Sequence, residues 1–127
     1  MTNAPILIRV ADVTGGPFAV SAVDAQRLYE RIAPLLRAGT PVALSFAGIE
    51  VLIGAFVRAA LGALCADFPV VRLEELLSLR DITPDDRDVV ERAMRNARAY
   101  YASPAAYDAA WAAEMGEAEA VQEATLP

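Results

Sequence analysis

The stretch Pro41-Val42-Ala43-Leu44-Ser45-Phe46 decides the fold of this 127-residue chain. It is short, carries no charge and is rich in bulky apolar side chains. This pattern is typical of a strand buried on both faces, because a strand with one wet face would alternate between apolar and polar residues. We therefore predict that residues 41–46 form the central strand of a sheet.

A helix is predicted on the N-terminal side of this strand. Ser21 stands three residues before Asp24, a near version of the capping box that starts many helices. The apolar residues between 25 and 36 follow helical spacing, and Gly39 ends the pattern. Pro34 removes one backbone donor, so we expect it to kink or shorten the last turn.

Two short strands are predicted before this helix, at residues 6–10 and 18–20. The sequence Thr14-Gly15-Gly16-Pro17 separates them and is typical of a tight turn. Because the two segments are so close in the chain, we expect them to pair with each other.

A second helix is predicted after the central strand. Residues 47–50 form a turn, the helix begins near Gly54, and Pro69 closes it. Gly62 lies in the middle of this helix, where glycine costs up to ~1 kcal/mol relative to alanine. We therefore expect Gly62 to mark close packing against the sheet.

Residues 70–82 have no single clear pattern, and strands and helical turns both fit them; we favour a strand near 76–80. The last helix is the clearest element, with Thr83 as its cap and acidic residues in its first turn. Its polar side has opposite charges at spacing four, and the expected ion pairs are Arg87 with Glu91, Asp88 with Arg92, and Glu91 with Arg95. A further short helix is expected from Ser103-Pro104, with Tyr107 and Trp111 on one face.

The order of these elements predicts an α/β fold: a small mixed sheet of about four strands with helices packed on it. Residues 1–110 form one domain, and residues 111–127 form an acidic, Ala/Glu-rich tail that we expect to be partly disordered. The net charge of −6 is concentrated at this end, because residues 103–127 contain five acids and no arginine.

The composition excludes several classes of function. The chain has no histidine, so a Ser-His-Asp or Cys-His site cannot form, and the commonest metal ligand is missing. We predict no catalytic residues, no metal site and no cofactor. The lone Cys65 is interpreted as a small core residue and cannot form an internal disulfide, which fits the cytoplasm.

Two kinds of partner are not expected. No charge-free stretch approaches the roughly 18 to 20 apolar residues of a membrane helix. The arginines of the last helix are interleaved with acids, so the chain lacks the basic excess that nucleic-acid binding requires.

Five motifs follow one another along the chain: Gly16-Pro17-Phe18-Ala19-Val20-Ser21, the helix with Leu28-Tyr29-Glu30 and Pro34-Leu35-Leu36, Val42 to Phe46 with Gly48-Ile49, Phe56 followed by Ala60-Leu61-Gly62-Ala63-Leu64, and Asn96-Ala97-Arg98-Ala99-Tyr100-Tyr101. In this order and spacing they resemble a bacterial STAS-like family of unknown function. The resemblance covers residues 14 to 110. It implies a STAS-like fold and a regulatory module that acts on partners through its surface.

In related bacterial STAS antagonists the partner is typically an anti-sigma kinase with a histidine-kinase-type ATPase fold. A serine or threonine at the start of the second helix accepts phosphate there. This chain has Glu50-Val51-Leu52-Ile53-Gly54-Ala55-Phe56 at that place, without a hydroxyl, so we expect no control by phosphorylation at this position. Ser45 replaces an aspartate that relatives often carry, and Arg58 stands where many have asparagine.

The predicted partner-binding site is the loop and helix start after the central strand, because α/β folds usually place function at the carboxyl ends of their strands. Its residues are Gly48, Glu50, Val51, Leu52, Ile53, Gly54 and Arg58. We expect Val51, Leu52 and Ile53 to be exposed apolar contacts and Arg58 to be a polar anchor. The predicted partner is another protein, a histidine-kinase-type ATPase or an anti-sigma-like regulator.

Three alternatives remain open from the sequence. The same helix start could bind the phosphate of a nucleotide or another small anion through its backbone N–H groups. The apolar loop, with Tyr107 and Trp111, could form a homodimer instead of binding a different protein. An enzyme that uses carboxylates alone is also permitted, although no recognisable constellation supports it.

Overall fold

The structure, a computed structural model, describes residues 4–102 of the chain. Its elements in chain order are β1 (Ile6–Arg9), α1 (Val10–Thr14), β2 (Phe18–Ala19), α2 (Ala22–Arg37), β3 (Val42–Ser45), β4 (Val51–Leu52), α3 (Gly54–Val57), the π-helical turn η1 (Arg58–Gly62), α4 (Leu64–Asp67), α5 (Val70–Leu76), β5 (Leu77–Arg80) and α6 (Pro84–Ala102). The further helix expected from Ser103 and the acidic tail 111–127 lie outside the described residues, as does the end of the predicted domain 1–110.

The strands form two small parallel sheets. Strand β3 lies between β1 and β5 in the larger sheet, and all four of its residues are buried, which confirms the predicted central strand. Strands β2 and β4 form the smaller sheet. The expectation of one mixed sheet of about four strands is therefore wrong in detail, since there are five strands in two sheets and every pair is parallel.

The first two strands do not pair with each other, contrary to the sequence-based expectation. Strand β1 pairs with β3, and β2 pairs with β4. The reason is α1, which begins at the buried Val10 and carries the chain away from the edge of the larger sheet. Gly15 ends α1 in the left-handed conformation, with φ of 75°, a region that glycine occupies without steric cost.

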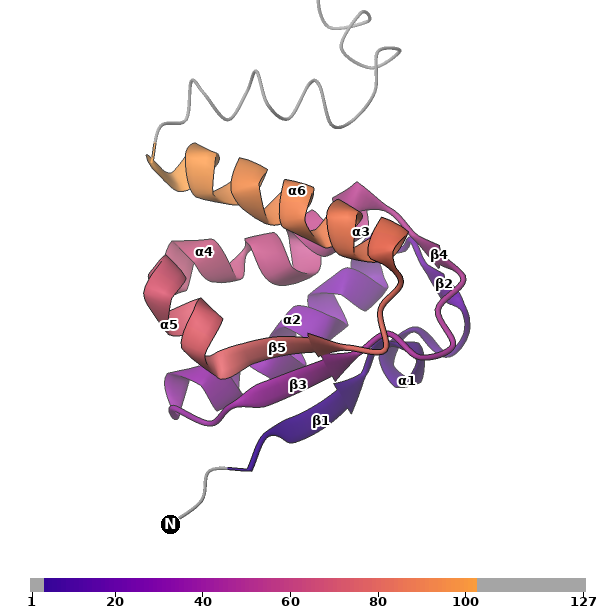
Figure 1. Cartoon of the computed structure of the whole chain (residues 1–127), viewed down its shortest axis with the longest axis horizontal. Helices are drawn as coiled ribbons and strands as arrows, with labels where there is room; N and C mark the ends of the chain where they lie inside the picture. Colours follow the sequence, from indigo (N-terminus) through magenta and orange to yellow (C-terminus); the bar gives the residue numbers. More distant parts are fainter. Residues whose placement is uncertain (1–3, 103–127) are drawn as a thin grey trace, which may run out of the picture.

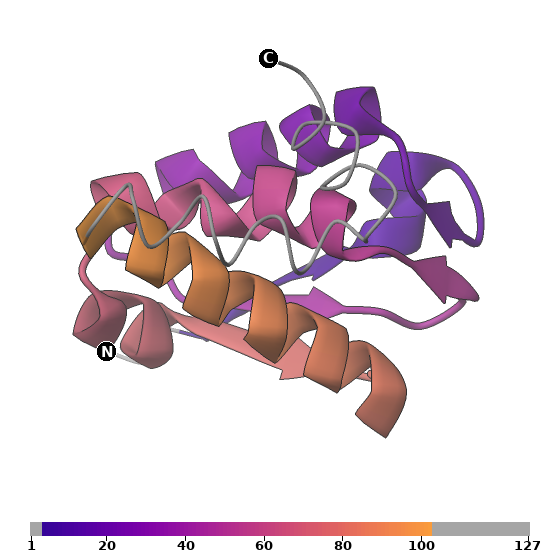
Figure 2. The same ribbon diagram turned by 90° about the horizontal axis from the view of Figure 1, so that it is seen from above.

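Three helical segments cover one face of the larger sheet. Helix α2, the continuous segment α3–η1–α4 and helix α6 lie side by side above the strands (Figures 1 and 2). The middle segment packs against both neighbours, and its buried residues include Phe56, Leu61 and Leu64. The core therefore lies between this helical layer and the inner face of β3.

The second helix of the prediction is present, but it is not regular. At η1 the N–H of Ala63 donates to the carbonyl of Arg58, five residues back, at 3.2 Å. Gly62, at the end of this turn, faces α6: a Cβ on it would lie 3.1 Å from Cβ of Ala97. The close packing expected at Gly62 is thus against a helix and not against the sheet.

The structure settles the ambiguous segment 70–82 and contains the predicted last helix. Residues 70–76 form α5, and the predicted strand near 76–80 is confirmed as β5. Thr83 caps α6, since its Oγ1 accepts from the N–H of Asp86 at 3.1 Å. Of the three expected ion pairs on α6, only Asp88–Arg92 forms within the described residues, at 2.7 Å.

Among residues 4–102, no single helix has the length and apolar composition to cross a membrane. The pair Gly54–Asp67 and Val70–Leu76 passes this test only when taken together, and a bend of 118° separates its two parts.

Candidate functional site: an exposed apolar ribbon

The predicted partner-binding loop contains a strand that the sequence analysis did not foresee. Val51 and Leu52 form β4, which lies in register with Phe18 and Ala19 of β2. The N–H groups of Glu50 and Val51 donate to the carbonyl of Pro17 at 2.8 and 3.1 Å. The N–H of Ile53 donates to the carbonyl of Ala19 at 3.4 Å, so the pairing continues past the strand end.

Alternation along these strands separates a buried face from an exposed one. Ala19 and Leu52 point into the core and are 0% and 8% exposed. The outward residues are apolar too, with exposed fractions of 57% for Phe18, 45% for Val20, 40% for Val51 and 38% for Ile53. We call this outer face, Phe18, Val20, Val51 and Ile53, the ribbon surface.

The predicted contact residues therefore divide into two groups. Val51 and Ile53 lie on the ribbon surface, as expected for a docking site. The expectation that Leu52 is exposed is wrong, because a strand turns successive side chains to opposite faces and Leu52 faces the core.

The remaining predicted residues flank the ribbon. Gly48, with φ of 83°, makes the turn between β3 and β4, and Glu50 is exposed at the start of β4. Gly54 begins α3, where the Ile53 carbonyl accepts from the N–H groups of Phe56 and Val57. Arg58 is half-buried in the π-helical turn and lines a groove between this segment and α6. It is therefore placed one turn along the helix from the ribbon strands.

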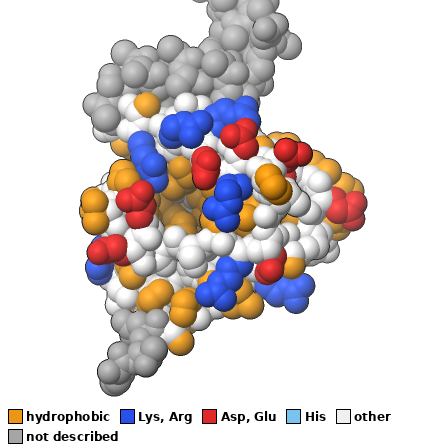
Figure 3. Space-filling view, viewed as in Figure 1, with side chains coloured by type: hydrophobic (Ala, Val, Ile, Leu, Met, Phe, Trp, Pro, Cys, Tyr) orange, Lys and Arg blue, Asp and Glu red, His pale blue; other side chains and the backbone are white. Residues whose placement is uncertain are grey.

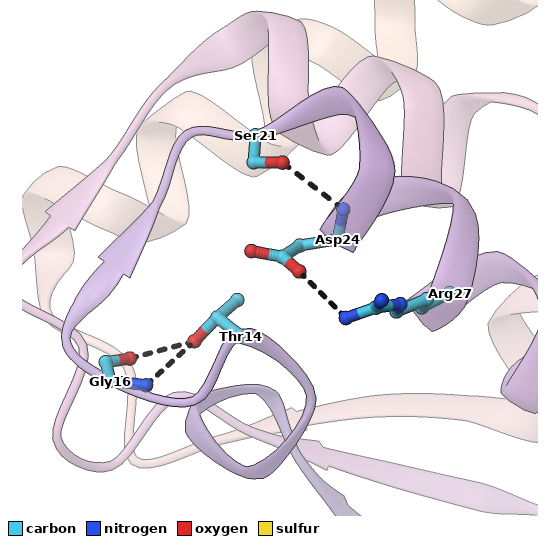
Figure 4. A network of polar contacts seen from close by, with 5 residues as sticks. All are labelled: Thr14, Gly16, Ser21, Asp24 and Arg27. Carbon is cyan, nitrogen blue, oxygen red and sulfur yellow. Dashed lines mark hydrogen bonds and ion pairs between the residues drawn. The ribbon is translucent and has the colours of Figure 1, made fainter.

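Polar contacts fix both ends of β2 (Figure 4). Before the strand, the Thr14 hydroxyl donates to the carbonyl of Gly16 at 2.7 Å and accepts from its N–H at 3.4 Å. After the strand, the Ser21 hydroxyl accepts from the N–H of Asp24 at 3.3 Å, which confirms the predicted cap. A two-residue strand has few hydrogen bonds of its own, so these contacts help to hold the ribbon surface in place.

A second contact anchors the loop that leads into β4. The buried Ser45 hydroxyl, at the carboxyl end of β3, donates to Oδ2 of Asp81 at 2.7 Å and accepts from the N–H of Ala47 at 3.3 Å. Asp81 follows β5 and has a positive φ of 55°, which is uncommon outside glycine. The pair thus ties together the ends of two neighbouring strands.

The described residues contain no cluster of metal ligands, and their one thiol is not activated. Within residues 4–102 no group of three or more Cys, Asp or Glu residues could hold a metal ion. Burial raises the pKa of the Cys65 thiol, and the nearby Arg98 guanidinium only partly offsets this effect. The thiol is therefore held in its protonated, less nucleophilic form.

Sequence reasoning missed Phe18, Val20 and Asp81 as parts of the site. The alternation Phe18-Ala19-Val20 was visible, but its partner strand was not, so nothing indicated that these side chains would join Val51 and Ile53. For Asp81 no local signal exists, because its contact with Ser45 spans two strands.

Comparison with known protein families gives a match. The model of a STAS-like domain of unknown function matches residues 24–87, which is half of the chain and includes most of α2, the central strand, β4 and β5. No curated protein and no solved structure matches the chain. With this match over a parallel α/β fold, the chain belongs to the family of STAS-like domains of unknown function.

Proposed function

We propose that this chain is a non-enzymatic regulatory module that docks another protein through the ribbon surface. Membership of a STAS-like family supports a regulatory role in general terms. The observation that carries the docking proposal is the ribbon surface itself: four exposed apolar side chains on the outside of one parallel strand pair and its continuation, with Phe18 and Val51 as register partners.

The arrangement of these side chains favours a binding surface over incidental exposure. Single exposed apolar residues are normal on proteins. Adjacent ones form an apolar patch whose hydration is unfavourable in free energy, and such patches often mark binding sites. Phe18 supplies the kind of large aromatic anchor that dominates interface energies. The buried Ala19 and Leu52 fix the backbone beneath, so little order has to be gained on binding.

The expected partner has an apolar groove that accepts Phe18 and Val51. By relation to bacterial STAS antagonists, we propose a histidine-kinase-type ATPase or an anti-sigma-like regulator. The stretch from Glu50 to Phe56 has no hydroxyl group, so docking is not switched by phosphorylation at this helix start. Control would then come from the partner or from the amount of either protein.

The experiment compares two site variants with a matched control. Ile53→Asp and Phe18→Asp each place a carboxylate on the ribbon surface. Val71→Asp makes the same kind of change at an apolar side chain that is 66% exposed on α5, away from the ribbon strands. All three proteins are first checked for native circular dichroism and thermal unfolding, and each is then used for tagged capture from a lysate of the source cells with quantitative mass spectrometry.

A partner that binds wild type and Val71→Asp but neither site variant, and that forms a 1:1 complex when purified, supports the proposal. An ATPase of the histidine-kinase type in that role also supports the proposed partner class. If folded Ile53→Asp and Phe18→Asp retain every partner, the ribbon surface is not the docking site. If wild type forms a dimer in sedimentation analysis and both site variants are monomers, the surface joins two copies and docking of a different protein is overturned.

A further inference from the structure

A pocket of about 380 Å³ opens between helix α6 and strand β5, with α5 at one end. It is separate from the ribbon surface, and none of its lining residues belongs to β2 or β4. Figure 3 shows it as a hollow with an apolar floor and charged side chains around its mouth. Side chains from four elements form the floor: Leu61, Leu73, Leu77, Leu79, Val90 and Met94.

Helix α6 packs mainly on the neighbouring helical segment, and the pocket opens between this helix and strand β5. Helix α6 contacts α3, η1 and α4. Strand β5 is at the edge of its sheet, and Leu77 and Leu79, two residues apart, share the face beneath α6. Both leucines are only half-buried. Part of their apolar surface is therefore not covered by other side chains and faces the pocket.

The mouth of the pocket carries charges of both signs. Glu91, Arg95 and Arg98 follow one another at spacings of four and three along α6, and Glu74 lies on α5. Among the described residues, Glu91 and Arg95 do not form the ion pair that their spacing predicts. Glu74, Glu91 and Arg95 are exposed, so water screens their charges.

Arg98 is different from these three residues. This residue is half-buried and its guanidinium lies near the Cys65 thiol, and its Nε atom is buried without a hydrogen-bond partner. A buried donor without an acceptor costs free energy, and such groups are rare in native proteins. A ligand oxygen that reached the Arg98 guanidinium from the pocket would meet a charge that is partly shielded from water.

We propose that this pocket binds a small amphipathic anion, a medium-chain carboxylate whose hydrocarbon chain lies on the leucine floor and whose carboxylate accepts hydrogen bonds from Arg98 and Arg95. The volume lies within the range of roughly 300 to 1,000 Å³ that is usual for small-molecule sites. The half-buried arginine favours an anion over a cation, because the two glutamates of the mouth are solvated.

The test uses three probes of equal chain length: octanoate, octylammonium and octanol. Binding to the full chain is measured by calorimetry below the concentrations at which the probes form micelles. We expect octanoate to bind at least tenfold more tightly than octylammonium, with octanol between them. Equal or tighter binding of octylammonium would overturn the assignment of an anion, and failure of all three probes to bind would overturn the site.

Two variants and a control locate the binding. Arg98→Gln is expected to weaken octanoate at least tenfold and to leave octanol within twofold, while Arg92→Gln, on the same helix but outside the pocket, changes neither. Leu79→Trp fills the floor and should abolish binding of both probes. Unchanged octanoate affinity in folded Arg98→Gln, or unchanged binding of both probes in folded Leu79→Trp, would contradict the proposal. The ribbon variants do not alter this pocket. If the pocket proposal is contradicted, the docking proposal is therefore unaffected.

Discussion

Phe18 on β2 and Val51 on β4 are registered partners in a parallel strand pair, and both side chains point to solvent while their neighbours Ala19 and Leu52 point into the core. The same short ribbon therefore has apolar side chains on both faces. Burial explains the inner face, and the proposed contact with a partner would account for the outer one.

This division predicts that substitutions on the two faces of the ribbon differ in their effect on stability. Phe18→Ser should change the free energy of unfolding by less than about 0.5 kcal/mol, as is usual for exposed positions. Leu52→Ala should lower it by about 2 to 3 kcal/mol, since it removes buried methyl groups and leaves a cavity. Urea unfolding of both variants measures the two values. A loss at Phe18 as large as the loss at Leu52 would show that Phe18 is part of the core.

The contact between Ser45 and Asp81 makes a second prediction. Ser45→Ala should lower the free energy of unfolding by about 1 to 2 kcal/mol, because the hydroxyl donates to a charged acceptor at 2.7 Å. It should also speed hydrogen exchange at the N–H of Ala47, which loses its acceptor.

Ser78→Ala is the matched control for this change. The Ser78 hydroxyl is on an exposed residue and lies 3.5 Å from the carbonyl of Val42, at the limit of a hydrogen bond. Its loss should change the free energy of unfolding by less than about 0.5 kcal/mol. Equal effects of the two substitutions would mean that the link between Ser45 and Asp81 adds nothing to stability.

The elements that could be predicted from the sequence are those with a strong local signal. The uncharged run 41–46 identified the central strand, and the caps Ser21 and Thr83 with helical spacing identified α2 and α6. Strand pairing is not local, so β1 and β2 were wrongly paired with each other. A helix as short as α1 carries too few residues for its period to be seen.

The candidate site was predicted only in part, because strand pairing has no local signal in the sequence. Val51 and Ile53 stood out as apolar residues in a loop. A strand of two residues has no measurable alternation, so the sequence could not show that Leu52 faces inward or that Phe18 lies beside Val51. The floor of the pocket under α6 could not be predicted from the sequence either, because its leucines come from segments that are not neighbours in the chain.

The contact between Gly62 and Ala97 makes a third prediction. Gly62→Ala gains up to about 1 kcal/mol of helix propensity. The new methyl group, however, lies 3.1 Å from Cβ of Ala97 and forces α6 away, which costs about 1 to 3 kcal/mol. We therefore expect the substitution to lower the free energy of unfolding by about 1 kcal/mol.

Removal of the opposing methyl group should reverse the sign. In an Ala97→Gly background, Gly62→Ala should raise the free energy of unfolding, because only the gain in propensity remains. A double-mutant cycle by urea unfolding gives the coupling between the two sites. Additive effects would mean that the helices are free to move apart at this point.

The hydrogen bond between Tyr29 and Asp67 makes a fourth prediction, which concerns pH. The Tyr29 hydroxyl donates to Oδ2 of Asp67 at 2.7 Å, and Arg37 lies beside both at 3.4 and 3.3 Å. This hydrogen bond to a carboxylate, followed by partial burial, raises the pKa of Tyr29 above its ordinary value of 10.0. The folded state therefore favours the protonated phenol.

The sign of the pH effect follows from this shift. The contact stabilises the fold from neutral pH up to the ordinary tyrosine pKa, and its contribution is lost as the pH rises through the raised pKa. Tyr29→Phe should lower the free energy of unfolding by about 0.5 kcal/mol at neutral pH, since the contact is near the surface. The difference from wild type should shrink steadily as the pH passes 10. Urea unfolding at a series of pH values measures it, with Tyr101→Phe as the control for loss of an exposed phenol. A deficit of Tyr29→Phe that stays the same above pH 10 would assign the effect to ring packing and not to the hydroxyl.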